Sequence, residues 1–171
     1  TTEIYTLSLH DALPISCGTG TAYGALKRMN MAGGHSLVVF GQGPVGTSGT
    51  MLGKAMGMHV IAVDISDERL KLARDAGADD TINAAKVDTV EEVRKLTGGK
   101  GAHYTLECSS SADARLAAIR ALRTWGTACY VGEGGTVTID VSADMLRRQA
   151  TVIGSWTFST NIQDKCTRFI A

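Results

Sequence analysis

Short apolar segments alternate with amphipathic segments along the chain from Ser36 onward. The first apolar run, SLVVF over 36–40, ends at a glycine, and its unbroken hydrophobicity is typical of a strand buried on both faces. Similar β-rich runs follow at regular intervals. The predicted strands are 36–40, 59–63, 81–82, 104–107, 127–131, 136–141 and 151–154.

Helical spacing of apolar residues fills the intervals between these strands. Pro44 suits the first turn of a helix, and Gly57 is a good C-terminal stop. Ser66 can cap the next helix, whose first turn carries acids where the helix dipole favours them. The predicted helices are 44–56, 67–76, 89–96, 112–122 and 142–149, with a last one starting at Asn161. This alternation predicts an α/β Rossmann fold, a doubly wound parallel sheet with helices on both faces.

The composition is that of an ordinary globular domain, with 44% hydrophobic and 20% charged residues. Seventeen basic and seventeen acidic residues cancel, so no basic excess indicates a nucleic acid partner. No apolar run approaches the ~18 residues of a membrane span. Cys17, Cys108, Cys129 and Cys166 lie far apart, which argues against a zinc knuckle or a disulfide framework and favours reduced thiols in a cytoplasmic protein.

The first sixteen residues show no cap or turn signal that joins them to the rest. Their stretch LHDALPI, at 9–15, resembles a translated sequencing adapter, and the segment lacks the basic start and apolar run of a secretory signal. We therefore predict a non-native tail over 1–16. The remainder, 17–171, has the length of one domain and is predicted to be truncated at its C-terminal end, within the last helix.

The glycine loop, GQGPVG at 41–46, stands between a predicted strand and a predicted helix. In that context a GxGxxG sequence binds the pyrophosphate of a dinucleotide. Gly41 permits the tight turn, Gly43 lets the backbone and the positive helix end approach the phosphates, and Gly46 allows close helix–strand packing. A methyltransferase can share this fold, but its loop seldom preserves all three glycines.

Asp64 ends the second predicted strand, eighteen residues beyond Gly46. An acid at this position accepts hydrogen bonds from the adenosine ribose hydroxyls. The 2′-phosphate of NADP would meet a like charge, at about 4 kcal/mol per charge pair for ~4 Å and an effective dielectric near 20, before solvent reduces it. We therefore predict NAD as the cofactor. Arg69 leaves both alternatives open, because a nearby arginine can accept the extra phosphate or can simply be a surface residue.

The segment CGTGTAYG at 17–24, followed by the glycine loop and Asp64, resembles the zinc-type medium-chain alcohol dehydrogenases. Within that family the sequence is most similar to the polyol and threonine dehydrogenase branch. The resemblance extends from Cys17 to about Phe158. It implies hydride transfer between a small-molecule alcohol and NAD, with zinc on a separate catalytic domain that is missing here. It also implies a homo-oligomer, and 151–155 is expected to be an exposed edge.

The resemblance also implies roles for single residues. Cys17 matches a ligand of the catalytic zinc, and Thr21 matches a position beside the nicotinamide ring. Val45, which follows Pro44 in the glycine loop, matches the residue that packs behind that ring. Arg69 matches a basic position at the adenosine ribose, and Val131 matches a contact to the carboxamide.

Ser109 and Ser110 follow another strand at the ligand edge, where either serine borders the cofactor or caps a helix. A catalytic zinc needs three protein ligands, and only Cys17 is available; no histidine stands at an expected position. We therefore predict NAD binding by these 171 residues without tight zinc binding or alcohol oxidation. Two alternatives stay open: an NAD-binding module without catalysis, and a fragment of a zinc-free quinone or enoyl reductase, against which Cys17 and Asp64 argue.

Overall fold

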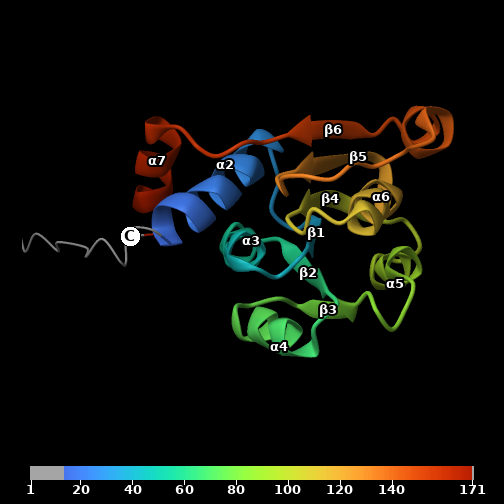
Figure 1. The fold of residues 1–171 in the computed structure, drawn as a ribbon, viewed down its shortest axis with the longest axis horizontal. Helices are drawn as coiled ribbons and strands as arrows, with labels where there is room; N and C mark the ends of the chain where they lie inside the picture. The colour runs from blue at the N-terminus through green and yellow to red at the C-terminus, as the bar shows by residue number, and fades with distance from the viewer. Residues whose placement is uncertain (1–13, 171) are drawn as a thin grey trace, which may run out of the picture.

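Six parallel strands form the centre of the molecule in the computed structural model, which describes residues 14–170 (Figure 1). The strands are β1 (Ser36–Phe40), β2 (His59–Asp64), β3 (Asp80–Asn83), β4 (Ala102–Glu107), β5 (Leu122–Tyr130) and β6 (Thr151–Gly154). Their order is β3-β2-β1-β4-β5-β6, and every neighbouring pair is parallel. The chain therefore winds outward in both directions from β1, which confirms the predicted doubly wound Rossmann fold.

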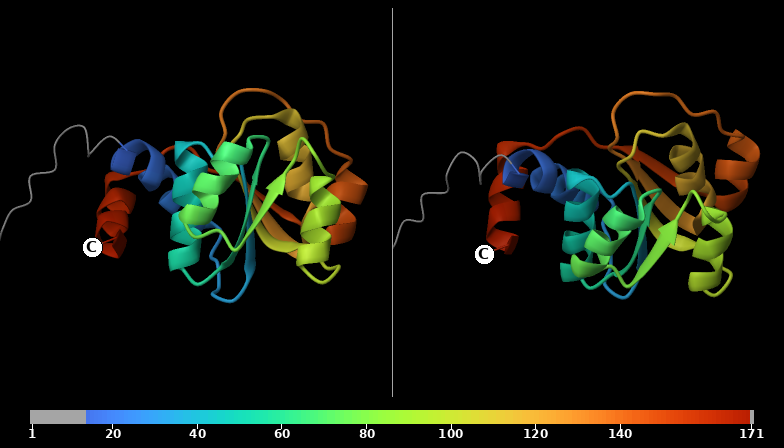
Figure 2. Two further views of the ribbon diagram at one scale, coloured as in Figure 1. Left: turned by 90° about the horizontal axis from the view of Figure 1, so that it is seen from below. Right: turned by 60° about the horizontal axis from the view of Figure 1, so that its bottom comes forward.

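Helices cover both faces of this sheet. They are α2 (Gly20–Arg28), α3 (Pro44–Ala55), α4 (Asp67–Asp75), α5 (Thr89–Leu96), α6 (Ala112–Arg120) and α7 (Thr160–Ile170). Helices α3 and α4 lie on one face, and α5 and α6 lie on the other, as both views of Figure 2 show. Helix α2 packs against α3, and α7 packs against α2 at the same end of the molecule.

Strand β1 is buried along its whole length, as its unbroken apolar sequence predicts. Because successive side chains point to opposite faces, Leu37 and Val39 join the core under α2 and α3, while Val38 and Phe40 join the core under α5 and α6. Each such fully buried side chain stabilises the fold by about 1.5–3 kcal/mol. Truncation of Leu37 to alanine would leave a hole in the first core.

Two predicted boundaries are wrong at the junction of α6 and β5. Helix α6 ends at Arg120, before the predicted 122, and β5 begins at Leu122 instead of 127. The reason is pairing with β4, because Leu122 lies opposite Ala102 and an irregular register then brings Thr127 opposite Tyr104. Strand β5 also ends at Tyr130, so Val131 lies one residue beyond the strand.

The segment 136–141 is not a strand, contrary to the prediction, and the predicted helix over 142–149 is two short turns. These turns are Val141–Met145, of π type, and Leu146–Arg148, of 3₁₀ type. The Asp140 carboxylate accepts the backbone N–H groups of Ser142 and Ala143 at 2.9 and 3.1 Å. Side-chain bonding to the local backbone thus takes the place of strand pairing.

The N-terminal part of the described chain contains helical structure that the sequence pattern did not predict. A π-helical turn, Pro14–Thr19, runs directly into α2. The proposed tail lies mostly outside the described residues, and its boundary at 16 stays a prediction. Of the segment 151–155, which was expected to be an exposed edge, residues 151–154 form the outermost strand β6 beside β5, with Val152 exposed, whereas Ser155 is buried. Over 14–170, every helix is too short or too polar to cross a membrane.

Candidate functional site

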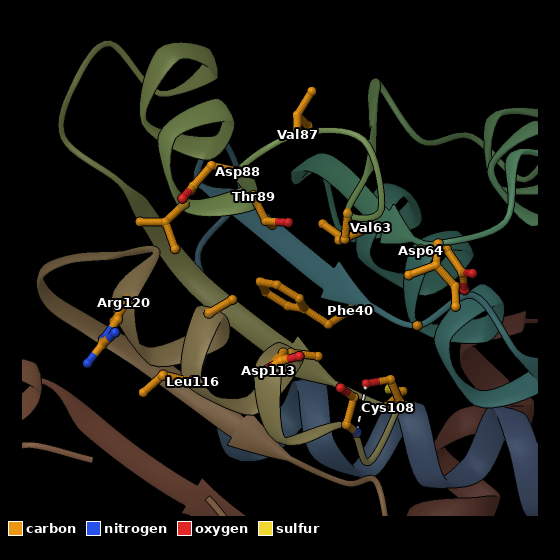
Figure 3. A pocket seen from close by; sticks show the side chains of 18 of the residues that line it. Phe40, Val63, Asp64, Val87, Asp88, Thr89, Cys108, Asp113, Leu116 and Arg120 are labelled. Atoms are coloured by element: carbon orange, nitrogen blue, oxygen red, sulfur yellow. Dashed lines mark hydrogen bonds between the residues drawn. The ribbon is translucent and has the colours of Figure 1, made fainter. Parts of the chain in front are cut away.

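A cavity of about 650 Å³ opens at the carboxyl ends of β1, β2 and β4 (Figure 3). It is walled by Phe40 and Asp64 from the sheet, Thr89 from α5, Cys108 beyond β4 and Leu116 from α6. Its size is within the ~300–1,000 Å³ of small-molecule sites. Because the winding direction reverses between β1 and β4, this is the place where open α/β sheets bind ligands.

The glycine loop adopts the geometry that its three glycines predict. Gly41 has a φ of +82°, and a Cβ there would come 2.8 Å from the Cβ of Ser109. A Cβ on Gly46 would overlap the carbonyl oxygen of Gly41, so this position needs glycine for packing. Gly43, the N-cap of α3, has no heavy atom within 4 Å of its Cβ position. The loop is therefore tight at both ends and open in the middle, where a phosphate would approach the helix end.

Gln42 supports this loop from inside, a role that sequence reasoning missed. Its side chain is buried, donates to the Val39 carbonyl at 3.0 Å and accepts from the Thr50 hydroxyl at 3.0 Å. The Thr47 hydroxyl also donates to the Gln42 carbonyl at 3.2 Å. A long amide between two glycines was the available signal, because a polar side chain there needs buried partners.

Asp64 lines the cavity and also ties the glycine loop to the turn after β2. One carboxylate oxygen accepts the Gln42 N–H at 2.6 Å, and the other accepts the Ser66 N–H at 3.0 Å. The Arg69 guanidinium lies 3.8 Å from this carboxylate, with its side chain 58% exposed. Arg69 lines the same cavity, so its position is compatible with both alternatives left open above.

The other predicted site residues lie outside the cavity wall. Cys17 is exposed and Thr21 is buried in α2. Val45 and Val131 are half-buried and pack against the core that α2 helps to form. The Gly18 Cβ position is 3.6 Å from the Pro44 carbonyl oxygen, so this segment sits against the start of α3. Cys17 and Thr21 thus lie beside the start of α3, and Val45 and Val131 pack against the core that α2 and α3 share with the sheet.

Among the residues that the structure describes, no three His, Cys, Asp or Glu side chains group closely enough to hold a metal ion. Cys17 alone therefore does not form a zinc site. Cys108, which lines the cavity, is a different kind of thiol, because burial raises its pKa far above the ordinary value. It stays protonated at neutral pH and contributes an uncharged wall.

The turn after β4, residues 108–111 and hereafter the β4 turn, was predicted to place a serine at the cofactor or at a helix cap. Ser109 borders the cavity, and Ser111 takes the N-cap position of α6. Sequence reasoning gave no role to Glu107, which is fully buried just before this turn. Its carboxylate accepts both the N–H and the hydroxyl of Ser109 at 2.6 Å. A charged residue ending an apolar strand was the only signal for it.

Comparison with known proteins identifies the family. The sequence model of the zinc-binding dehydrogenase family matches residues 44–171. An uncharacterized zinc-type alcohol dehydrogenase-like protein of Escherichia coli is 40% identical over 162 residues, which cover 94% of this chain and 46% of that protein. An NAD-dependent alcohol dehydrogenase of Sulfurisphaera tokodaii is 38% identical over 107 residues, covering 61% of this chain and 31% of that enzyme.

Among solved structures, an alcohol dehydrogenase of Thermotoga maritima superposes with a TM-score of 0.87 and 28% identity, over 95% of this chain and 48% of that one. The chain spans less than half the length of the curated relatives it matches. The family match runs from the first turn of α3 onward, so it covers five of the six strands and Asp64 but not Gly41 and Gly43 of the glycine loop. The chain belongs to the zinc-binding dehydrogenase family.

Proposed function

We propose that this chain is the NAD-binding domain of a zinc-dependent alcohol or polyol dehydrogenase, which transfers hydride between an alcohol and NAD. The observation that carries the proposal is the pairing of two features at one sheet edge. Gly43 leaves an open approach to the N-terminus of α3, and Asp64 lines the adjoining cavity. A dinucleotide needs both, an anion-binding helix end for its pyrophosphate and an acceptor for its ribose hydroxyls.

Each half of the cofactor has its own residues in this proposal. Gly41 and Gly46 hold the loop shape, and Asp64 and Arg69 serve the adenosine ribose inside the cavity. Pro44 begins α3 and carries no N–H, so the phosphates would bind N–H groups of the residues that follow it. On the nicotinamide half, we propose that Thr21, Val45 and Val131 orient the ring. Val45 and Val131 pack against the core to which α2 contributes, and Thr21 is buried in that helix, which supports this assignment.

Zinc does not fit the described residues by themselves, because Cys17 has no second and third ligand among them. We propose that Cys17 is one zinc ligand and that the others come from a part of the protein beyond these 171 residues. When bound, zinc would lower the pKa of the alcohol and so prepare it for hydride loss. Free thiols at Cys17, Cys108, Cys129 and Cys166 are compatible with a cytoplasmic enzyme.

We propose a small-molecule alcohol as the substrate and a homo-oligomer as the assembly. The support for the assembly is the outer edge of β6, which presents unpaired backbone groups and the exposed Val152. The alternative function, an NAD-binding module without catalysis, keeps the cofactor and omits the alcohol. It is favoured by one observation: residues 14–170 contain no group of three His, Cys, Asp or Glu side chains that could hold a metal ion. An alcohol oxidation assay on the full-length protein separates the two.

Calorimetric titration with NAD tests the proposal directly. The wild-type chain is expected to bind NAD, and Gly43→Ala is expected to weaken binding about tenfold, because the added methyl occupies the phosphate approach. Gly154→Ala is the matched control, since its Cβ position also has no neighbour within 4 Å and lies on β6, away from the site. Equal affinities of all three proteins, or no NAD binding by the wild type, would refute the proposal.

A further inference from the structure

Glu107 is a buried acid that the cofactor roles above leave unused. Its carboxylate oxygen Oε1 accepts the N–H and hydroxyl of Ser109 and, at 2.9 Å, the N–H of Ser110. Its backbone carbonyl accepts the N–H groups of Val131 and Gly132 at 2.9 and 3.0 Å. One residue therefore joins the β4 turn to the segment after β5, residues 131–135, which we call the β5 loop.

Arg115 completes the connection from α6. Its Nε lies 3.6 Å from Oε2 of Glu107, and its Nη2 donates to the Gly132 carbonyl at 2.7 Å. The Tyr130 hydroxyl donates to the Arg115 carbonyl at 2.8 Å. Within the described chain, Oε2 is the one buried side-chain polar atom without a hydrogen-bond partner. The arginine therefore balances the buried charge at a distance while it binds the β5 loop directly.

Ser110 shows what this network holds in place. Its φ is +66°, in the left-handed region that residues with a side chain rarely adopt. A Cβ on Gly132 would come 2.6 Å from the Ser110 nitrogen and 2.9 Å from Oε2 of Glu107. The β4 turn and the β5 loop are thus in close contact, and the strained residue donates its N–H to Glu107.

We propose that Glu107, paired with Arg115, is a positioning residue that locks the β4 turn to the β5 loop and thereby sets the shape of the dinucleotide cleft. The β4 turn contributes Cys108, Ser109 and Ser111 to the cavity wall, and the β5 loop carries Val131. Neither Glu107 nor Arg115 lines the cavity, so both act through the loops they hold. The consequence for NAD rests on the proposed function, whereas the lock itself does not.

Hydrogen exchange measures the lock without any cofactor. In Glu107→Gln, the amides of Ser109 and Ser110 are expected to exchange at least about tenfold faster than in the wild type, because they lose a charged acceptor. The amides of Gln42 and Ser66, which the Asp64 carboxylate holds, serve as the internal reference and are expected to keep their rates. Unchanged rates in the β4 turn, or the same acceleration at both sites, would overturn the proposal.

NAD titration measures the consequence. Glu107→Gln is expected to weaken NAD binding about tenfold per folded molecule. Leu122→Ala is the stability control, because Leu122 is buried at the start of β5, at the end of the sheet opposite the cavity. This variant is expected to retain wild-type affinity. Adding Ser110→Gly to Glu107→Gln is expected to restore most of the affinity, since glycine adopts the positive φ without being held there.

Three results would contradict this consequence: wild-type affinity in Glu107→Gln, an equal loss in Leu122→Ala, or no recovery with Ser110→Gly. If the wild type itself binds no NAD, the proposed function falls, and hydrogen exchange still decides the lock. If Glu107→Gln does not fold, Arg115→Lys takes its place. Lysine keeps the charge but replaces the planar guanidinium fork with a single ammonium, so a smaller effect of about threefold is expected in the same direction.

Discussion

Two carboxylates stand at strand ends, Asp64 as the last residue of β2 and Glu107 as the last residue of β4, and their surroundings differ. Each accepts backbone N–H groups from the turn that follows its strand. The Asp64 side chain is also nearly buried, at 4% exposure, but it lines the cavity, and its arginine neighbour Arg69 is 58% exposed. Glu107 is fully buried behind the cavity wall, and the side chain of its arginine neighbour Arg115 is 9% exposed.

Position at the carboxyl edge of the sheet therefore does not by itself define a ligand-binding residue. Asp64 lines the cavity, where a ligand can reach its carboxylate. The Glu107 carboxylate is enclosed by Ser109, Ser110 and Arg115. It therefore contacts the β4 turn and α6 and not a ligand in the cavity. The electrostatic energies should differ accordingly, because solvent weakens the first pair and is excluded from the second.

The largest expected effect is on stability, from removal of the buried arginine. Arg115→Met leaves the Glu107 carboxylate without its counter-charge and cuts the bond to the Gly132 carbonyl. We expect a loss of roughly 3–5 kcal/mol in the free energy of unfolding, measured by urea denaturation. A loss below about 1 kcal/mol would mean that the two carboxylates are energetically alike, and the comparison would fail.

The second effect concerns cofactor choice and separates the two acids. Asp64→Asn removes the charge that a 2′-phosphate would meet, so the preference for NAD over NADP should shrink by at least about tenfold. Glu107→Gln should weaken both cofactors by the same factor, because they share the nicotinamide half. Parallel titrations with NAD and NADP check this. A changed NAD-to-NADP ratio in Glu107→Gln would place Glu107 at the ribose and contradict its positioning role.

Sequence reasoning found Asp64 and missed Glu107 for a physical reason. The glycine loop, its helix and the acid that ends β2 form a motif with a recognisable spacing along the sequence. The Glu107 network joins residues whose approach depends on the packing of β4, β5 and α6. No periodic pattern encodes such contacts. The fold itself was predictable, since the two-sided burial of β1 appears directly as an apolar run.

The wrong prediction at 136–141 and the missed helix α2 also arise from contacts between segments that are distant in the chain. The alternating sequence of 136–141 does not pair with β5, because β6 already occupies the outer side of β5. Helix α2 was missed because glycines such as Gly20 and Gly24 disfavour helices. In the folded protein, their Cβ positions lie 3.1 Å from Phe158 and 3.3 Å from Ile162, so close packing of the chain accounts for these glycines. Tertiary contacts decide both segments.

A third prediction uses the pH dependence of stability to test whether the surroundings of Tyr130, next to Glu107 and Arg115, exclude solvent. Burial, and then the nearby Glu107 carboxylate, raise the pKa of Tyr130 to about 12, against roughly 10 in the unfolded chain. The folded state therefore favours the neutral phenol. This stabilisation is complete below about pH 10 and is lost as the pH rises towards 12.

Tyr130→Phe should cost about 1 kcal/mol at pH 8, from the lost bond to the Arg115 carbonyl. The stability gap between wild type and variant should then narrow from pH 10 upward, because only the wild type has this phenol to ionise. Urea denaturation at pH 8, 10 and 11 measures the gap. A constant gap would indicate that Tyr130 is solvated and that the surroundings of Glu107 are as open to solvent as those of Asp64.

The smallest effect should come from the exposed arginine. Arg69→Met removes a partner that lies 3.8 Å from Asp64 and is largely solvated, so the free energy of unfolding should change by less than about 1 kcal/mol. It is the matched control for Arg115→Met, with the same substitution beside the other strand-end carboxylate.

The effect of Arg69→Met on NADP binding decides the role of Arg69 that the sequence left open. If Arg69 accepts a 2′-phosphate, NADP binding weakens while NAD binding is unchanged. If it is a surface residue, both affinities stay the same, and Asp64 alone determines cofactor choice.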